Sequence, residues 1–253
     1  MSRNKTSRQQ RILAELEQTP SLRVNELAEL MDVSPETIRR DLDALSHDGL
    51  IDRTYGGALR RRPLEPNVSE RHTFRVAERE SMARRARPLL GESRHLMIGS
   101  GATTMHMARR IAVEMKNVTV IAHSFGVATV LSLNPTITVL MAPGIYHPGE
   151  GGMHGSATIR FLQDFRVDWA ILGASGLTPD GPADALIESA DVYAMMMRQA
   201  THTLLLADSG KFGGSFPARW AKWTDIDALA TDAEPDGELR EAILAGGTRI
   251  HCA

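Results

Sequence analysis

The sequence has a single cysteine, Cys252, among 253 residues, so it cannot form an intrachain disulfide framework. That usage suits a reducing cytosol. An excess of basic charge is missing as well: the formal net charge is −2, which argues against a protein that coats nucleic acid by bulk charge. A local basic patch remains compatible with this balance.

Long apolar runs are also missing, and none approaches the roughly 20 residues that span a bilayer. The first residues, MSRNKTSRQQR, are basic and polar, without the apolar core of a signal peptide. We therefore expect a cytoplasmic protein that does not contact membranes. The hydrophobic share of 42% is ordinary for a globular protein with a sizeable core.

Motifs for metal binding and for nucleophilic catalysis are not found. The histidines are scattered without a His-x-x-x-His pair, and no cysteine cluster exists, so we expect neither a metal site nor a cofactor. No Gly-x-Ser-x-Gly nucleophile elbow occurs.

What is present begins with three short helical patterns in residues 8–52. The first two are marked by apolar residues at helical spacing, namely Ile12, Leu13 and Leu16, and then Val24, Leu27, Ala28 and Met31. The third has Ser34 as its N-cap and Pro35 at its first position, and Asp48-Gly49 closes it after about His47. Two short strands, 50–53 and 58–60, can then pair through Gly56-Gly57.

The third helix has an apolar stripe of Ile38, Leu42 and Leu45, which should pack on the first two helices. Helix, turn, helix and hairpin form a winged helix-turn-helix, whose third helix enters the major groove of DNA, where an arginine can bond guanine with two hydrogen bonds. The polar residues of the third helix and the hairpin are the expected DNA contacts: Ser34, Glu36, Thr37, Arg39, Arg40, Arg53 and Tyr55. Arg60, Arg61 and Arg62 could add phosphate contacts.

Two other interpretations of this region stay open. It could be a solvated three-helix bundle in which Arg39 and Arg40 are adjacent by chance. It could also be a protein-docking module, which predicts no salt-dependent DNA binding.

The remainder of the chain predicts an α/β domain. Residues 61–90 are read as a linker and a charged connecting helix over 69–90, because the segment combines arginines, prolines and little apolar content. Short apolar runs then alternate with helical patterns, which indicates a mostly parallel sheet covered on both faces. The runs are 96–98, 118–122, 137–142, 169–172, 203–207 and 228–230. The expected organisation is a winged helix-turn-helix at 1–60, with its helix-turn-helix at about 22–41, and an α/β effector domain at 91–253.

A glycine-rich loop, Gly99-Ser100-Gly101-Ala102-Thr103-Thr104, links the first of these strands to a helix. The N-terminus of a helix offers free backbone N–H groups and the positive end of the helix dipole, which suits an anion. The loop is not a P-loop, and it has one glycine too few for a dinucleotide fingerprint. A plain strand-to-helix turn explains it equally well.

Other loops should converge on the same edge, because ligands bind beyond the carboxyl ends of parallel strands. The loop residues concerned include His123, Ser124, Gly144, Gly173 and Lys211. Lys211 is suitably placed for a cation facing phosphate, although a solvated loop lysine is an equal alternative.

Spaced motifs run through both parts of the chain. In the amino-terminal part they are Val33-Ser34, Thr37-Ile38-Arg39-Arg40-Asp41-Leu42, Leu45, Gly49, Arg53 and Gly56-Gly57-Ala58. Further on they are Gly155-x-Ala157-Thr158, Phe165-Arg166-x-Asp168, Ile171-Leu172-Gly173-x-Ser175-Gly176 and Asp208-x-x-Lys211-Phe212-Gly213. In these motifs the chain resembles the DeoR family of bacterial sugar-responsive transcription regulators, and its second part is similar to the glycerol-3-phosphate regulon repressor subgroup.

This resemblance implies a C-terminal domain similar to ribose-5-phosphate isomerase that binds a phosphorylated sugar without converting it. It makes Ser100, Gly101, Thr103 and Thr104, with Ala102 between them, the expected phosphate cradle, and Lys211 a second anchor. It also implies that Asp168 and Asp208 are polar or structural members of the site.

The sequence departs from the family pattern at four places that would meet the sugar. Family members often carry Asp in place of Gly99, Thr-Asn in place of Ala122-His123, Gly-Gly in place of Pro143-Gly144 and Lys in place of Tyr193. We therefore hypothesise that the effector differs from the usual family ligand, and that His123 and Tyr193 help to recognise it.

The sequence as a whole predicts a regulator, most simply a repressor of a carbohydrate-catabolism operon, that binds operator DNA as a homodimer or homotetramer. The alternative is a sugar-phosphate isomerase or transferase with an accessory helix-turn-helix, which needs a general base such as Glu188 or Asp180.

Overall fold

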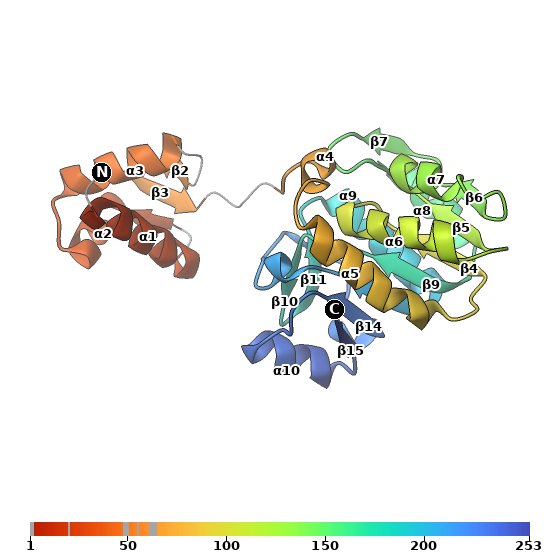
Figure 1. Cartoon of the computed structure of the whole chain (residues 1–253). Coiled ribbons are helices and arrows are strands. Elements are labelled where there is room, and N and C mark those ends of the chain that lie inside the picture. The colour runs from red at the N-terminus through yellow and green to blue at the C-terminus, as the bar shows by residue number, and fades with distance from the viewer. Residues whose placement is uncertain (1–2, 20, 48–50, 55, 61–64) are drawn as a thin grey trace. The chain divides into compact units, whose positions relative to one another are not determined.

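The computed structural model describes residues 3–19, 21–47, 51–54, 56–60 and 65–253. The chain divides into two compact units, Met1–Leu64 and Glu65–Ala253, which we call the N-terminal and C-terminal units (Figure 1). The predicted helix stop at Asp48-Gly49, the residue Tyr55 and the arginines Arg61 and Arg62 lie outside the described residues. Among the described residues, no helix has the length and apolar character needed to cross a membrane.

The N-terminal unit contains three helices and a small antiparallel sheet. Its elements are α1 (Arg3–Gln18), β1 (Ser21–Arg23), α2 (Val24–Met31), α3 (Pro35–His47), β2 (Ile51–Thr54) and β3 (Gly57–Arg60). The predicted hairpin is confirmed as β2 paired with β3, and β1, which was not expected, pairs with the other edge of β3. The order helix, turn, helix and hairpin confirms the winged helix-turn-helix.

The core of the N-terminal unit consists of the predicted stripes. Ile38 and Leu42 of α3 are fully buried, and they lie in one cluster with residues of α1 and α2. The side chain of Ser34 accepts a hydrogen bond from the backbone N–H of Thr37 at 3.3 Å, which confirms it as the cap of α3. Asp32, in the left-handed region at φ 51°, ends α2 and begins the turn between the two helices.

The C-terminal unit is built on a seven-stranded sheet in the order β15-β14-β12-β9-β4-β5-β6, and every neighbouring pair is parallel. The strands are β4 (His95–Ile98), β5 (Thr119–Ala122), β6 (Thr138–Met141), β9 (Val167–Leu172), β12 (Ala200–Leu206), β14 (Ala228–Thr231) and β15 (Arg249–Cys252). This confirms the predicted α/β fold. The chain builds outward from β4 in one direction and continues from β9 in the other, so β4 and β9 flank the switch point of the topology.

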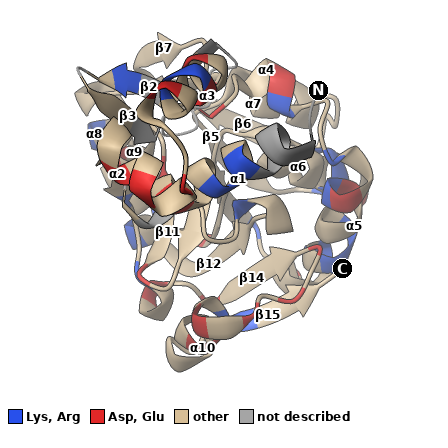
Figure 2. Cartoon of the chain, turned by 90° about the vertical axis from the view of Figure 1, so that its left-hand side faces the viewer, with Lys and Arg blue, Asp and Glu red and all other residues tan. Residues whose placement is uncertain are grey.

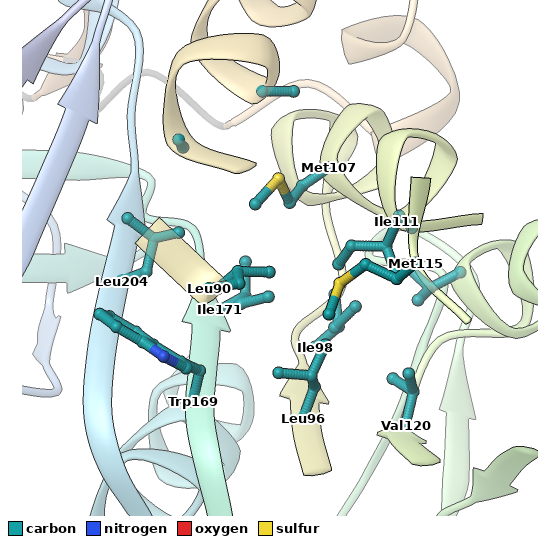
Figure 3. Close-up of a cluster of buried hydrophobic side chains, with 14 of the residues drawn as sticks. Leu90, Leu96, Ile98, Met107, Ile111, Met115, Val120, Trp169, Ile171 and Leu204 are labelled. Carbon is teal, nitrogen blue, oxygen red and sulfur yellow. The ribbon is translucent and has the colours of Figure 1, made fainter. Parts of the chain in front are cut away.

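Helices cover both faces of this sheet. They are α5 (Val76–Ala86), α6 (Ala102–Glu114), α7 (Phe125–Leu131), α8 (Ser156–Gln163), α9 (Ile187–Gln199) and α10 (Gly237–Ala245). Leu96 and Ile98 of β4 pack with α5, α6 and α7 (Figure 3). Met97 between them packs with the cluster of α8, α9 and α10. The alternation of side chains along a strand thus divides the apolar residues between two cores.

Short elements fill the connections of the C-terminal unit. A hairpin of β7 (Ile145–His147) and β8 (Gly152–His154) follows β6, and β10 (Gly176–Thr178), β11 (Gly181–Asp184) and β13 (Ala218–Arg219) form a separate antiparallel sheet. Two 3-10 turns, η2 (Ser209–Lys211) and η3 (Trp223–Asp225), follow β12 and precede β14.

The single helix expected over 69–90 is wrong, because the segment breaks at Arg75. It forms α4 (Val68–Arg71), α5 and the 3-10 turn η1 (Arg87–Leu90), and Arg75 takes the left-handed conformation at φ 49° between the two α-helices. Met82, Ala83 and Ala86 of α5 are buried. This charged segment therefore packs against the sheet rather than running through solvent.

Candidate nucleic-acid interface and anion pocket

The exposed face of α3 carries the residues expected to contact DNA. Arg39 and Arg40 both pair with Glu36, at 3.3 Å and 3.8 Å, and basic and acidic residues lie together on this helix in Figure 2. The side chains of Arg39 and Arg40 are 53% and 78% exposed. Such surface pairs contribute only about 0–1 kcal/mol, so both guanidiniums remain available to another molecule.

Arg53 of β2 is held more firmly. Its Nε lies 3.2 Å from a carboxylate oxygen of Asp43 on α3, and its Nη1 donates to the backbone oxygen of Gly57 at 3.4 Å. These contacts fasten the hairpin to α3. A contact of Arg53 with DNA stays a prediction, as does that of Tyr55, which lies outside the described residues.

A buried ion pair joins α1 to α3 in the N-terminal unit. Arg8 Nε lies 2.5 Å from Asp41 Oδ2, and the Asp41 side chain is only 2% exposed. Asp41 belongs to the motif Thr37-Ile38-Arg39-Arg40-Asp41-Leu42. Its structural role is to hold α3 on α1 with the arginines facing outward.

A pocket lies at the carboxyl ends of β4, β9 and β12 in the C-terminal unit. The loop after β4 contributes Ser100 to Thr104, the loop after β9 contributes Gly173 and Ala174, and Lys211 comes from the turn after β12. The structure thus brings together the predicted cradle, Gly173 and Lys211 at the switch point of the sheet.

The N-terminus of α6 forms one wall of this pocket. Its N-cap residue is Gly101, at φ 124°, which has no side chain to cap the helix. The first backbone N–H groups of a helix have no acceptor within the helix, and they carry the positive end of its dipole. This wall favours an anion.

Charged side chains form another part of the pocket. Lys211 Nζ lies 2.6 Å from Glu65 Oε1, and Arg71 bridges Glu65 and Glu150 at 2.5 Å each. Burial raises the pKa of Glu65, but the charges of Lys211 and Arg71 outweigh it, so the pKa lies below its ordinary value. Burial raises the pKa of Asp184, which also lines the pocket, to about 7.

His123 and Tyr193 lie behind Ser100 and fix its position. The backbone N–H of Ser100 donates to His123 Nε2 at 2.9 Å, and the Tyr193 hydroxyl donates to the Ser100 carbonyl oxygen at 2.6 Å. His123 is fully buried, and its Nδ1 lies 3.0 Å from the carbonyl oxygen of Met153. Both ring nitrogens are therefore engaged, which corrects the expectation that His123 faces the effector; Tyr193 does line the pocket.

Two of the departures from the family pattern are in contact. A Cβ at Gly99 would lie 2.8 Å from Cε1 of Tyr193, so the ring occupies the space that a side chain at position 99 would need. Glycine at 99 and tyrosine at 193 are matched in volume. Burial raises the pKa of Tyr193 further above neutral pH.

Three predicted effector residues lie elsewhere. Asp168 is near the amino end of β9, at the opposite edge of the sheet, where it accepts the backbone N–H groups of Arg94 and His95 at 2.8 and 2.9 Å. Ser124 is buried at the start of α7, and Gly144 packs against Thr158 and His154. Asp168 is thus a structural link between β4 and β9, and its assignment to the pocket is wrong.

Sequence reasoning missed Glu65, Arg71, Arg79, Glu150 and Asp184 as pocket residues. The first three stand in a segment rich in charge and proline, which is typical of a solvated linker. Their partners are far away in the sequence: Lys211 is 146 residues from Glu65. No local pattern carries that information.

The buried histidines predict how the stability of the C-terminal unit depends on pH. Burial lowers the pKa of both His123 and His154 to about 4, from 6.5 in an unfolded chain. Between these values the unfolded chain binds more protons, so stability falls as the pH drops from about 6.5 to 4. For His123 alone the loss at pH 4.5 is about 2–3 kcal/mol.

Urea unfolding at pH 6.5 and 4.5 measures this loss, with His123→Gln as the comparison. The variant should lose about 2 kcal/mol less than the wild type between the two pH values. Asp184 contributes in the opposite direction, because its raised pKa favours the folded state at lower pH, but it is the same in both proteins. Equal losses would contradict a neutral, buried His123.

Known proteins with similar sequences cover both units. Residues 8–63 match the DeoR-like helix-turn-helix domain, and residues 75–233 match the DeoR C terminal sensor domain. The chain is 30% identical over 244 residues to the glycerol-3-phosphate regulon repressor of Escherichia coli (strain K12), covering 94% of this chain and 95% of that protein. It is also 30% identical over 227 residues to the HTH-type transcriptional repressor CsqR of the same strain, covering 88% and 85%.

Among solved structures, ribose 5-phosphate isomerase A from Methanocaldococcus jannaschii is similar to part of this chain. It is 18% identical, covers 53% of each chain and gives a TM-score of 0.39.

Proposed function

Because the chain belongs to the DeoR family of DNA-binding transcriptional regulators, we propose that it represses a carbohydrate-catabolism operon in the cytoplasm. A phosphorylated sugar or polyol binds in the pocket of the C-terminal unit and changes the affinity of the protein for operator DNA. The observation that carries this proposal is the pocket itself: a helix N-terminus, Lys211 and Arg71 meet at the switch point of a parallel sheet.

The chemistry of the pocket supports a small anionic ligand. The N-terminus of α6 and Lys211 suit a phosphate group, while Asp184 offers a carboxyl group to a sugar or polyol. The matched pair Gly99 and Tyr193 supports an effector that differs from the usual family ligand.

Regulation requires that the effector bind two arrangements of the protein with different affinity, since equal binding shifts no equilibrium. A single winged helix-turn-helix buries little DNA surface, so we propose that a homodimer or homotetramer reads repeated half-sites. Gel shifts on the DNA upstream of its own operon, with pentose phosphates, hexose phosphates and glycerol 3-phosphate, test the whole proposal. A protein that binds this DNA equally with every compound has no such effector. Glycerol 3-phosphate as the tightest ligand would contradict the altered specificity.

One observation favours an enzyme as the second candidate. Asp184 lines the pocket with a pKa of about 7, which meets one requirement of a general base. The earlier candidates Glu188 and Asp180 do not line the pocket. We propose that the chain has no such activity, in keeping with relatives named as repressors. Turnover of pentose or hexose phosphates that is lost in Asp184→Asn would establish the enzyme instead.

Arg40→Ala should weaken specific operator binding by about 1–3 kcal/mol, because Arg40 is the most exposed arginine of α3 and can reach base edges. Fluorescence anisotropy with operator and with random DNA measures this loss and its dependence on salt. Arg240→Ala, which removes an exposed arginine from the C-terminal unit, is the matched control and should leave binding unchanged. Equal operator affinity in both variants, with the fold intact, would remove Arg40 from the DNA-contacting residues.

A further inference from the structure

Glu65, the first residue of the C-terminal unit, places its carboxylate inside the pocket. Its side chain is only 3% exposed, although it follows directly on a segment rich in arginine and proline. Three contacts hold it. One oxygen lies 2.6 Å from Lys211 Nζ and 2.5 Å from Arg71 Nη1, and the other accepts the hydroxyl of Ser175. The Ser175 hydroxyl oxygen in turn accepts a hydrogen bond from the backbone N–H of Ala185 at 3.1 Å.

These contacts neutralise the cations of the pocket. Lys211 pairs with Glu65, Arg71 pairs with Glu65 and Glu150, and Arg79 pairs with Asp208 at 3.1 Å. A phosphate group at the N-terminus of α6 needs the same Lys211. Its charge would also lie close to the Glu65 carboxylate in a site screened from water, where like charges repel strongly.

We propose that Glu65 is an internal occupant of the effector pocket, and that an anionic effector binds by displacing its carboxylate from Lys211 and Arg71. This inference rests on the proposed function, because it describes how the same pocket is regulated. Phosphate and Glu65 compete for one pair of cations. By thermodynamic linkage, anything that stabilises Glu65 in the pocket weakens effector binding by the same factor, and the reverse also holds.

The position of Glu65 in the chain connects this exchange to the N-terminal unit. β3, the last strand of that unit, ends at Arg60, only five residues before Glu65. The next backbone attachment to the C-terminal unit is the N–H of Val68, which donates to the carbonyl oxygen of Gly149 at 2.7 Å. Displacing Glu65 therefore lengthens the tether between the units by up to three residues, or about 10 Å. A longer tether changes how readily linked DNA-binding units engage two half-sites together.

Glu65→Gln tests the exchange, because the amide keeps the size of the side chain and removes its charge. Isothermal titration of the full chain with inorganic phosphate, in phosphate-free buffer, should show about tenfold tighter binding than in the wild type. Glu70→Gln is the matched control, since it removes the same charge from an exposed position on α4, and should bind phosphate like the wild type. Equal phosphate affinity in the wild type and Glu65→Gln would overturn the inference.

A second variant and a second readout keep the test decisive. Glu65→Gln could fail to fold because Lys211 and Arg71 lose their counter-ion. In that case Glu65→Asp, whose side chain is shorter by one methylene, should bind phosphate with an affinity between those expected for the wild type and for Glu65→Gln. Wild-type affinity in Glu65→Asp would overturn the inference. In operator binding without ligand, Glu65→Gln should behave like the wild type saturated with effector.

The two proposals fail in different ways. A wild type that responds to a sugar phosphate, with a Glu65→Gln variant that matches it in every measurement, overturns the internal occupant alone. A wild type whose operator binding no sugar phosphate alters overturns the proposed effector.

Discussion

Gly57→Ala is expected to unfold the N-terminal unit while the C-terminal unit stays folded. Gly57 lies in the central strand β3 and faces Arg23 of β1 on one side and Thr54 of β2 on the other. A Cβ at this position would lie 2.3 Å from the backbone oxygen of Leu22 and 3.0 Å from the Cα of Arg23. Backbone atoms cannot move aside as a flexible side chain can, so β1 would have to leave the sheet.

The expected cost is at least about 3 kcal/mol, the upper end for overpacking a well-packed site. A unit of this size has a margin of only about 3–5 kcal/mol, so the variant should lose most of its folded population. Among the residues that the structure describes, the cores of the two units have no residue in common, so the pocket should stay intact. Loss of operator binding with unchanged phosphate binding is therefore the expected combination.

Gly56→Ala is the control for this variant. Unlike Gly57, Gly56 has a positive φ, 115°, and no atom lies within 4 Å of its would-be Cβ. Its substitution adds only backbone strain, about 1–3 kcal/mol. Amide exchange measured by mass spectrometry over residues 8–47 distinguishes the two, and equal protection of those residues in both variants would contradict the clash.

The parts of the fold that the sequence predicted correctly are those governed by local rules. Leu96, Met97 and Ile98 alternate between two cores because successive side chains of a strand point to opposite faces. Ser34 caps α3 because its side chain reaches an N–H group only three residues away. The loops after β4, β9 and β12 meet because their strands are parallel.

The parts that the sequence did not predict depend on contacts between distant segments. Asp168 was assigned to the pocket through a motif. It lies near the amino end of β9, whereas the pocket lies at the carboxyl end of that strand. Glu65 lies in a segment whose composition is typical of a linker, and it comes close to Lys211 only when the chain is folded. His123 looked like a polar group at a strand end, but both of its nitrogens are used within the protein.

The second large loss of stability is expected when Arg79, a buried charged residue of α5, is replaced. Arg79 is 4% exposed, and its Nε and Nη2 lie 3.2 and 3.1 Å from Asp208 Oδ2. Its third nitrogen donates to the backbone oxygen of Arg71. Arg79 therefore fastens α5 and the end of α4 to the loop after β12, where Lys211 also stands.

Arg79→Met is expected to destabilise the C-terminal unit by about 3–5 kcal/mol, because it leaves the Asp208 carboxylate buried without its main partner. Asp208 would retain only the backbone N–H of Gly210 and a more distant Arg75, at 3.7 Å. Guanidinium chloride unfolding, followed by the fluorescence of Trp169, Trp220 and Trp223, all in this unit, measures the change.

Two further variants separate charge burial from a general effect of losing an arginine. Arg240→Met removes one partner of an exposed pair, whose side chains are 48% and 52% accessible, and should cost less than about 1 kcal/mol. Arg79→Met combined with Asp208→Asn removes the uncompensated charge and should recover part of the stability that the single variant loses. If the two side chains do not interact, the effects of the two substitutions add, and the double variant is less stable than Arg79→Met by the full effect of Asp208→Asn alone. That result would mean that apolar packing, and not this ion pair, holds α5 to the pocket.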